Sequence, residues 1–333
     1  YLYALAKSYQ FGENIDGAID FYERSFAVNS DDVNILNNIG NLHWKNDKLN
    51  DAAIAFERAI EIDPYDKTSV LNISSLMLRL GNNQGALRKC NDFIKLKPDC
   101  VDVQLMKGKI FIAMKNFSEG EKSFEKACKT LPDRFETWEG LGDCLYGGGD
   151  TAGAVKKYNI AAKLNPKSFN SFFQLGFIRM ENGHFSTALK CFRRAARIRP
   201  DSIETLFNIG QIFHKKGDHY YKEAIQYYNK ALEINPNHGY TLAEKLYLSA
   251  MICDWDEIEN LRLQLPSIGT TVGVVPPFAL LALEDAPDRH KIRAERFCAD
   301  TIVPGKLPNF VMPSGKQNKI KVGYFSGDFH LHP

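Results

Sequence analysis

The sequence has no long hydrophobic run and no marked excess of charge of either sign. Its most apolar candidate, residues 271–283, is interrupted by Pro276 and Pro277 and is shorter than the roughly 18 residues that a membrane-spanning helix needs. The 42 basic and 40 acidic side chains leave a formal net charge of +2. We therefore expect neither a membrane partner nor a nucleic-acid partner.

Paired cysteines are also absent. The seven cysteines are scattered without a CxxC pair or the spacing of metal ligands, so we expect no metal site and no disulfide framework. This usage is typical of a reducing compartment, and we expect a cytoplasmic protein, or also a nuclear one in a eukaryote. The chain starts at Tyr1, without an initiator Met, which predicts a piece of a longer protein.

What the sequence does contain is an internal repeat of 34 residues. Proline recurs at this interval at Pro64, Pro98, Pro132, Pro166 and Pro200, and Pro236 follows after 36 residues. Glycine keeps the same phase at Gly40, Gly108, Gly142, Gly176 and Gly210. An aromatic residue does so at Phe56, Phe124, Tyr158, Phe192 and Tyr228, with alanine before and after it. This period and composition are the signature of tetratricopeptide repeats.

Physical reasons account for the residue types in this pattern. Two amphipathic helices of about a dozen residues fit each repeat, the small residues let them approach closely, and proline ends the second helix. Such a pair cannot bury its own apolar face, so the repeats must stack into a right-handed superhelix with a concave groove. The fold class is therefore all-α over residues 1–238, with one partial and six full repeats.

The pattern decays after Pro236. Residues 239–266 predict a terminal, degenerate helical pair, and residues 267–318 a linker that holds one helix, at about 289–300. Residues 319–333 are rich in β-branched and aromatic residues and predict a strand followed by a turn.

A row of amides is the candidate binding site. The sixth position of the first helix carries an amide in four of six full repeats: Asn38, Asn72, Gln174 and Asn208. An amide offers a donor and an acceptor, so such a ladder could hold the backbone of an extended peptide without demanding a sequence. Met106 and Gly140 interrupt it, which predicts two binding stretches. The alternative is that these amides are merely tolerated polar residues on a wet surface.

Three segments near the C-terminus resemble a known family. Cys253-Asp254-Trp255, the VPPFALLAL segment at 275–283 and the GYxSxDFxxHP motif at 323–333 occur in this order after the repeats. Together they resemble the junction into the catalytic region of the O-linked N-acetylglucosamine transferases, whose architecture the plant SPINDLY-type protein O-fucosyltransferases share. The resemblance implies that 319–333 begins a truncated α/β domain of the GT-B type. His332 corresponds to a histidine of that motif, either a general base or a group that orients the sugar or diphosphate.

The resemblance implies an inverting transferase that moves N-acetylglucosamine from UDP-GlcNAc to Ser or Thr of proteins. The repeats would bind extended Ser/Thr-containing segments of acceptor proteins, and a homodimer through the repeats is compatible with it. UDP-GlcNAc would be a substrate rather than a cofactor, its site would lie beyond Pro333, and residues 1–333 alone are expected to be inactive. The alternatives are a GDP-fucose-dependent transferase and a non-catalytic scaffold. A co-chaperone is less favoured, because capturing a terminal carboxylate needs convergent Lys and Arg.

Overall fold

The computed structural model describes residues 1–276, 280–281 and 283–301. Apart from an isolated bridge between Ile268 and Val272, these residues form helices joined by turns and loops. The helices are α1 (Leu2–Phe11), α2 (Ile15–Val28), α3 (Val33–Lys45), α4 (Leu49–Ile62), α5 (Lys67–Arg79), α6 (Asn83–Leu96), α7 (Val101–Ala113), α8 (Phe117–Thr130), α9 (Phe135–Gly147), α10 (Thr151–Leu164), α11 (Phe169–Glu181), α12 (Phe185–Ile198), α13 (Ile203–Lys215), α14 (Tyr221–Ile234), α15 (Gly239–Met251), α16 (Trp255–Leu261) and α17 (Pro287–Thr301), with a 3-10 turn, η1 (Asp218–Tyr220), before α14.

The helices form antiparallel pairs in the predicted phase. In each pair an odd-numbered first helix packs against the even-numbered second helix that follows it, from α1–α2 to α15–α16. The recurring prolines fall just after the second helices; α4, for example, ends at Ile62 and its C-cap Asp63 precedes Pro64. Short polar side chains begin many helices, as when Asp66 caps α5 by accepting from the backbone of Thr68 and Ser69.

The turn between the two helices of each pair contains one residue with a positive φ angle at the same repeat position. Half of these residues are not glycine, and φ is +56° at both Asp47 and Lys115. The full series is Glu13, Asp47, Gly81, Lys115, Gly149, Gly183, Gly217 and Cys253. Gly147 thus ends α9, and Gly148 and Gly149 form such a turn.

The recurring aromatic side chains fill the space that the recurring glycines leave. The ring of Phe124, wholly buried, lies where a Cβ on Gly108 of α7 or on Gly140 of α9 would be, within 2.5 Å of it in both cases. Phe56, Tyr158, Phe192 and Tyr228 occupy the same place against Gly40, Gly142, Gly176 and Gly210. Glycine therefore sets how closely neighbouring helices approach.

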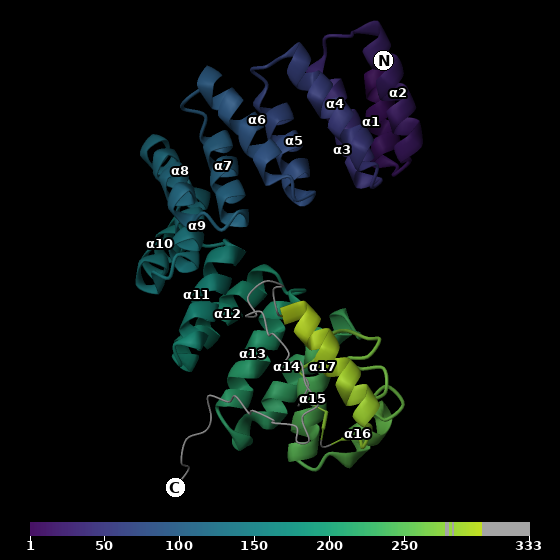
Figure 1. Ribbon diagram of the computed structural model, residues 1–333, viewed down its shortest axis with the longest axis vertical. Helices are drawn as coiled ribbons and strands as arrows, with labels where there is room; N and C mark the ends of the chain where they lie inside the picture. Colours follow the sequence, from purple (N-terminus) through teal and green to yellow (C-terminus); the bar gives the residue numbers. More distant parts are fainter. Residues whose placement is uncertain (277–279, 282, 302–333) are drawn as a thin grey trace, which may run out of the picture.

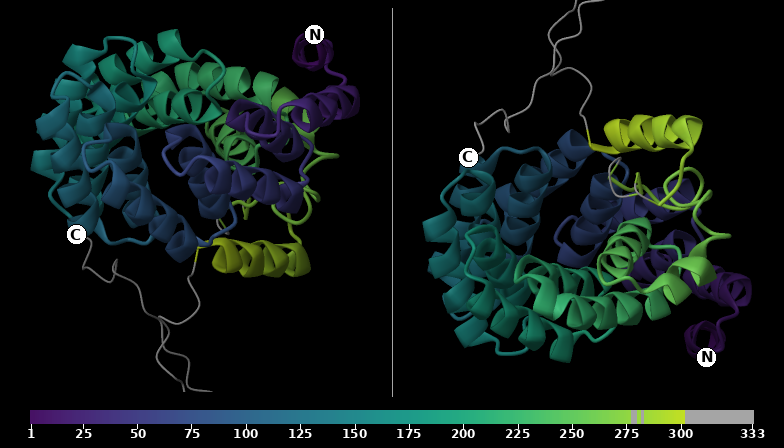
Figure 2. Two further views of the ribbon diagram at one scale, coloured as in Figure 1. Left: turned by 90° about the horizontal axis from the view of Figure 1, so that it is seen from above. Right: turned by 90° about the horizontal axis from the view of Figure 1, so that it is seen from below.

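Stacking of the pairs produces the predicted superhelix, which Figure 1 shows from the side. Successive first helices contact one another, as α3 does α5 and α5 does α7, so they lie on the inner face. Viewed along the long axis, the backbones of the pairs curve around a central axis (Figure 2). The prediction of an all-helical superhelix is confirmed, whereas the strand predicted at 319–333 lies outside the described residues.

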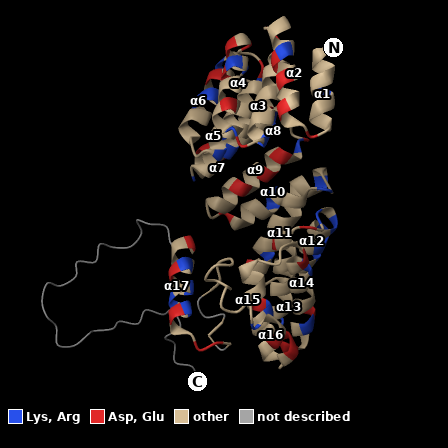
Figure 3. Ribbon diagram, turned by 90° about the vertical axis from the view of Figure 1, so that its right-hand side faces the viewer, with Lys and Arg blue, Asp and Glu red and all other residues tan. Residues whose placement is uncertain are grey.

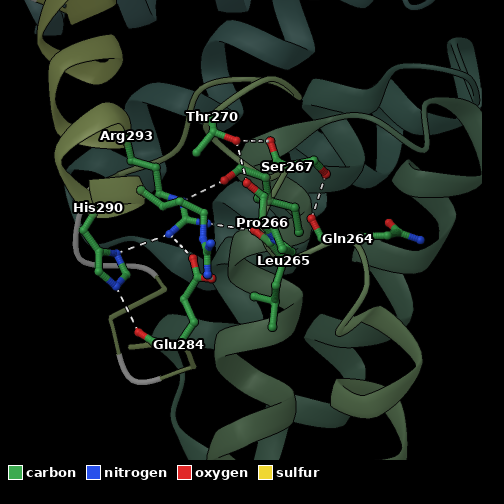
Figure 4. A network of polar contacts seen from close by, with 10 residues as sticks. Gln264, Leu265, Pro266, Ser267, Thr270, Glu284, His290 and Arg293 are labelled. Atoms are coloured by element: carbon green, nitrogen blue, oxygen red, sulfur yellow. Dashed lines mark hydrogen bonds and ion pairs between the residues drawn. The ribbon is translucent and has the colours of Figure 1, made fainter. Parts of the chain in front are cut away.

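Helix α17 is attached to the end of the array by a buried arginine. Arg293 is fully buried, and its guanidinium donates to the backbone oxygens of Leu265 and Ile268, both at 2.7 Å. It also forms an ion pair with Glu284 and donates to Nδ1 of His290 (Figure 4). These contacts hold α17 against the loop that follows α16, on the side of α15 seen in Figure 3.

Candidate peptide-binding surface

The four predicted amides lie on first helices at the inner face of the superhelix. Asn38 is on α3, Asn72 on α5, Gln174 on α11 and Asn208 on α13. Their exposure differs: the first three are half-buried, whereas Asn208 is only 9% exposed. Asn38, Asn72 and Gln174 are therefore more exposed than Asn208.

Asn38 and Asn72 are oriented by hydrogen bonds to neighbouring repeats. The amide nitrogen of Asn72 donates to Oδ1 of Asn37 at 3.0 Å, and that of Asn38 donates to the hydroxyl of Tyr3 at 3.2 Å. Each bond uses one of the two N–H groups of the amide and fixes its plane. These two amides are thus held in place before any peptide binds.

Asn37, one residue before the predicted position, connects two repeats and was not identified from the sequence. It is 5% exposed, and its amide nitrogen donates to Asp66 at 3.0 Å and to the hydroxyl of Ser69 at 2.9 Å. Burial opposes ionisation of Asp66, but the hydrogen bonds from Ser69 and Asn37 outweigh it and lower the pKa of this carboxyl below its usual value. The hydrogen bonds from Asn72 to Asn37 and from Asn37 to Asp66 therefore fix the amide of Asn72 within the row of predicted amides.

The same position in α9 is filled by Glu139, which makes an equivalent connection. Its carboxylate accepts from the backbone nitrogen of Ser171 at 3.1 Å and from the Ser171 hydroxyl at 2.6 Å, and it also bonds Ser168, the N-cap of α11. Glu139 follows Asn37 by three repeats of 34 residues. In the sequence, Asn37 and Glu139 are recognisable only as polar residues at the fifth position of a first helix. Which residues of the next repeat they contact is evident only from the fold.

The interruption of the ladder at Gly140 has a structural cause, whereas Met106 is a partly buried residue of the apolar core. A side chain at Gly140 would collide with the ring of Phe124, so no amide fits there. Nearby acidic groups are also engaged within the protein: Asp102 bonds Lys67 and Arg134, both at 2.6 Å. Hydrogen bonding and the charges of these two cations lower the pKa of Asp102 despite its partial burial. In this region Gly140 therefore serves packing against Phe124, and Asp102 is engaged in ion pairs within the protein.

A second acid in this region, Asp143, is half-buried. The Tyr158 hydroxyl donates to Oδ1 of Asp143 at 2.6 Å. Burial raises the pKa of Asp143, and the hydrogen bond from Tyr158 opposes that shift only in part. Burial and the neighbouring carboxylate likewise raise the pKa of Tyr158. The pair joins the two helices of one repeat, α9 and α10.

The segments that resemble the glycosyltransferase junction have structural roles where they are described. Cys253 is the left-handed turn residue between α15 and α16, Asp254 caps α16 by accepting from the backbone of Glu257, and Trp255 is 62% exposed. Val275 and Leu280 are buried against α15. His332 and the rest of the GYxSxDFxxHP motif lie outside the described residues.

Comparisons with known proteins identify the family. Models of the tetratricopeptide repeat match residues 3–67, 105–169 and 203–238, and a model described as TPR repeat matches residues 178–217. The chain belongs to the tetratricopeptide-repeat family. None of the described helices combines the length and apolar character that crossing a membrane requires.

Individual relatives match part of the chain. Protein STIP1 homolog of Dictyostelium discoideum is 30% identical over 132 residues, which is 39% of this chain and 23% of that protein. RNA polymerase II-associated protein 3 of Mus musculus is 26% identical over 114 residues, 34% of this chain and 17% of that protein. The chain thus matches less than a quarter of the length of either relative.

Solved structures share the fold. A tetratricopeptide repeat protein from Parabacteroides merdae ATCC 43184 superposes with a TM-score of 0.58 at 16% identity, covering 70% of this chain and 92% of that one. The structure of PilF from Pseudomonas aeruginosa gives a TM-score of 0.53 at 18% identity, covering 59% of this chain and 89% of that one. At these identities the likeness concerns the fold alone.

Proposed function

We propose that this chain is a protein-interaction module whose inner face binds extended segments of partner proteins. The observation that carries the proposal is the pair Asn38 and Asn72, two half-buried amides held by neighbouring repeats on the inner face of a superhelix. Amides fixed in advance bind a peptide backbone with little loss of side-chain entropy. The scaffold function also agrees with the family and with the two relatives, which are not described as glycosyltransferases.

The hydrogen bonds that Asn38 and Asn72 already make determine which of their groups a peptide could contact. One N–H of each amide is used inside the protein, so a second N–H and the carbonyl oxygen remain for a ligand. A peptide in extended conformation presents alternating N–H and C=O groups, which can bond to the remaining carbonyl oxygen and N–H group of each amide. The contact is with backbone, so we expect weak dependence on peptide sequence.

Calorimetry with the variant Asn38→Ala/Asn72→Ala tests the proposal. The probe is a Ser/Thr-rich peptide of about twelve residues with both ends capped, long enough when extended to cross several repeats. A hydrogen bond is worth about 1 kcal/mol, so losing one bond at each of the two amides should weaken affinity about thirtyfold. The matched control is Asn50→Ala/Gln84→Ala, two exposed amides on the second helices α4 and α6, which should leave affinity unchanged.

The same peptide with a free C-terminal carboxylate separates backbone binding from carboxylate capture. Equal affinity for the free and the amidated peptide supports the amide ladder. Unchanged affinity in the double variant would reject it, provided that thermal unfolding shows both variants to be folded. A strong preference for the free carboxylate would instead favour a co-chaperone type of groove.

We further propose a more specific role, as the acceptor-binding region of a protein O-glycosyltransferase. Its support is the resemblance of the three C-terminal segments, with His332 in the position of the motif histidine and UDP-GlcNAc as the expected donor. The test is an assay of the full-length gene product for transfer of labelled sugar to Ser/Thr proteins. Transfer from UDP-GlcNAc that is lost in His332→Ala supports this role, transfer from GDP-fucose selects the fucosyltransferase, and transfer from neither leaves the scaffold.

A further inference from the structure

The outer face of the superhelix carries two rows of cations in the phase of the repeat. Both rows cross the second helices α6, α8, α10 and α12, and every member is exposed. The first row is Arg88, Lys122, Lys156 and Lys190, and the second is Lys95, Lys129, Lys163 and Arg197. On each helix the two rows are seven residues apart, or about 10 Å along the axis.

The rows end at defined helices. At the equivalent positions α4 has Ile54 and Glu61, and α14 has Gln226 and Glu233. The cations are thus confined to four consecutive repeats of a chain whose net charge is only +2. Such a concentration on one face gives a local positive potential that the overall charge does not reveal.

Within this region α10 and α12 differ from the helices before them. On α6 and α8 acidic neighbours neutralise the rows in part, since Lys95 pairs with Asp92 and Lys122 with Glu119. Neither α10 nor α12 contains an Asp or Glu, and together they carry seven Lys and Arg side chains. In the described structure none of these seven forms an ion pair with a carboxylate.

Two arginines at the edge of this surface are already oriented. Arg194 donates to the backbone oxygen of Pro166 at 3.1 Å and lies over the ring of Phe172, while Arg199 lies 4.1 Å from the ring centroid of Phe169. These contacts link α12 and its C-cap residue to α11 and to the turn after α10, and they restrict the two side chains. A restricted guanidinium retains N–H groups that fit a carboxylate in a bidentate manner.

We propose that the outer face of α10 and α12 is a second binding surface, for an acidic polypeptide segment in extended conformation. We call Lys156, Lys163, Lys190, Arg193 and Arg197 the outer cation surface. The separation of the two rows, about 10 Å, lies between the lengths of two and four residues of an extended chain, so Asp or Glu side chains two or four apart, which share one face of the chain, can reach both rows. Neither helix has an exposed aromatic side chain of the kind on which single-stranded nucleic acid stacks, which favours a polypeptide partner.

Fluorescence anisotropy with a labelled peptide of about ten glutamates tests this surface at low salt. The variant Lys156→Gln/Lys163→Gln/Lys190→Gln/Arg197→Gln should bind the peptide about tenfold more weakly or worse, because it removes four unpaired cations. The matched control Lys48→Gln/Lys115→Gln/Lys215→Gln/Lys291→Gln lowers the net charge equally at exposed positions elsewhere and should bind within about twofold of the unaltered chain. Thermal unfolding checks that both variants are folded.

Three further measurements test where the acidic peptide binds and which class of ligand this surface prefers. Peptide binding that survives in Asn38→Ala/Asn72→Ala places the acidic segment outside the inner groove and supports the proposal independently of the proposed function. Failure of the unaltered chain to bind the glutamate peptide, or equal weakening by the control variant, would overturn it. Tighter binding of a single-stranded oligonucleotide, or of vesicles containing phosphatidylserine, at the same salt concentration would replace it with a nucleic-acid or membrane surface.

Discussion

At the scale of single residues, the turn between paired helices requires a left-handed backbone conformation, which costs non-glycine residues more than glycine. Eight equivalent residues adopt a positive φ, and only four of them are glycine. A left-handed conformation costs an ordinary residue about 1–2 kcal/mol, because its Cβ approaches the following carbonyl oxygen. Lys115, at φ +56°, therefore retains strain that Gly81 and Gly149, at the same position in the two neighbouring repeats, avoid.

Replacing Lys115 by glycine should stabilise the protein. The release of strain exceeds the entropy that glycine adds to the unfolded chain, so we expect Lys115→Gly to raise the free energy of unfolding by about 0.5–1 kcal/mol. Urea unfolding followed by circular dichroism measures the change. The control is Lys126→Gly, at an exposed position within α8, which should lower the free energy of unfolding by about 1 kcal/mol. Destabilisation by Lys115→Gly would contradict the interpretation.

Residue types in a repeat could be predicted from the sequence where packing alone decides them. The phase of Phe124 and Gly108 predicted their close approach because nothing but glycine fits against that ring. The exposure of the amides could not be predicted in the same way: Asn208 occupies the same position as Asn72 but is nearly buried. That difference depends on what the neighbouring repeats place beside each residue, which a period in the sequence does not encode.

At the scale of secondary-structure elements, α17 shows how a mostly polar helix is attached to a solenoid. Arg293, fully buried, binds two backbone oxygens of the loop after α16 and pairs with Glu284. Burial opposes ionisation of Glu284, but hydrogen bonds from Arg289 and Arg293 outweigh it and lower the pKa of this carboxyl. The sequence predicted the helix from its charges and length, whereas the role of Arg293 depends on the fold of residues 262–276.

Arg293→Met should release α17 from the array. The substitution leaves backbone oxygens and Glu284 without a buried partner, at a cost of about 3–5 kcal/mol to the docking of this helix. Hydrogen exchange by mass spectrometry should show loss of protection in α17 and residues 265–275, with α3 to α14 unchanged. The control Lys291→Met alters an exposed cation on the same helix and should leave exchange as it is. Protection equal to that of the unaltered chain would show that Arg293 does not anchor the helix.

The pH dependence of this attachment follows from the direction of the Glu284 shift. Because the pKa of Glu284 is lower in the folded than in the unfolded chain, its contribution to stability is complete above the unfolded value, near 4.5, and is lost as pH falls through the folded value. Exchange protection of α17, corrected for the intrinsic rate, should therefore decline on acidification below about pH 4.5, and Arg293→Met should remove that decline.

At the scale of the whole molecule, each repeat contacts mainly its neighbours, so stability is carried by a series of interfaces. Two of these interfaces have a buried or half-buried polar connection at the same repeat position: Asn37 joins α3 to α5, and Glu139 joins α9 to α11. Asn37 is near the N-terminal end of the solenoid, and Glu139 is in its middle. We therefore expect the loss of such a polar connection to affect unfolding differently at the end of the solenoid and in its middle.

Glu139→Ala should weaken the coupling between the two halves of the solenoid. The variant loses the contacts of Glu139 with the Ser168 and Ser171 hydroxyls and with the Ser171 backbone nitrogen, whereas the Ser168 cap of α11 remains, and we expect a cost of about 2–4 kcal/mol to this interface. When an interface in the middle of such a series weakens, the parts on either side can unfold separately, so we expect urea unfolding to broaden or divide into two transitions. Asn37→Ala removes a comparable set of bonds near one end, where only α1 to α4 lie on the short side, and the main transition should keep its slope. If the two variants gave the same change in midpoint with a single unbroadened transition, the solenoid would unfold as one cooperative unit, and the place of an interface in the series would not matter.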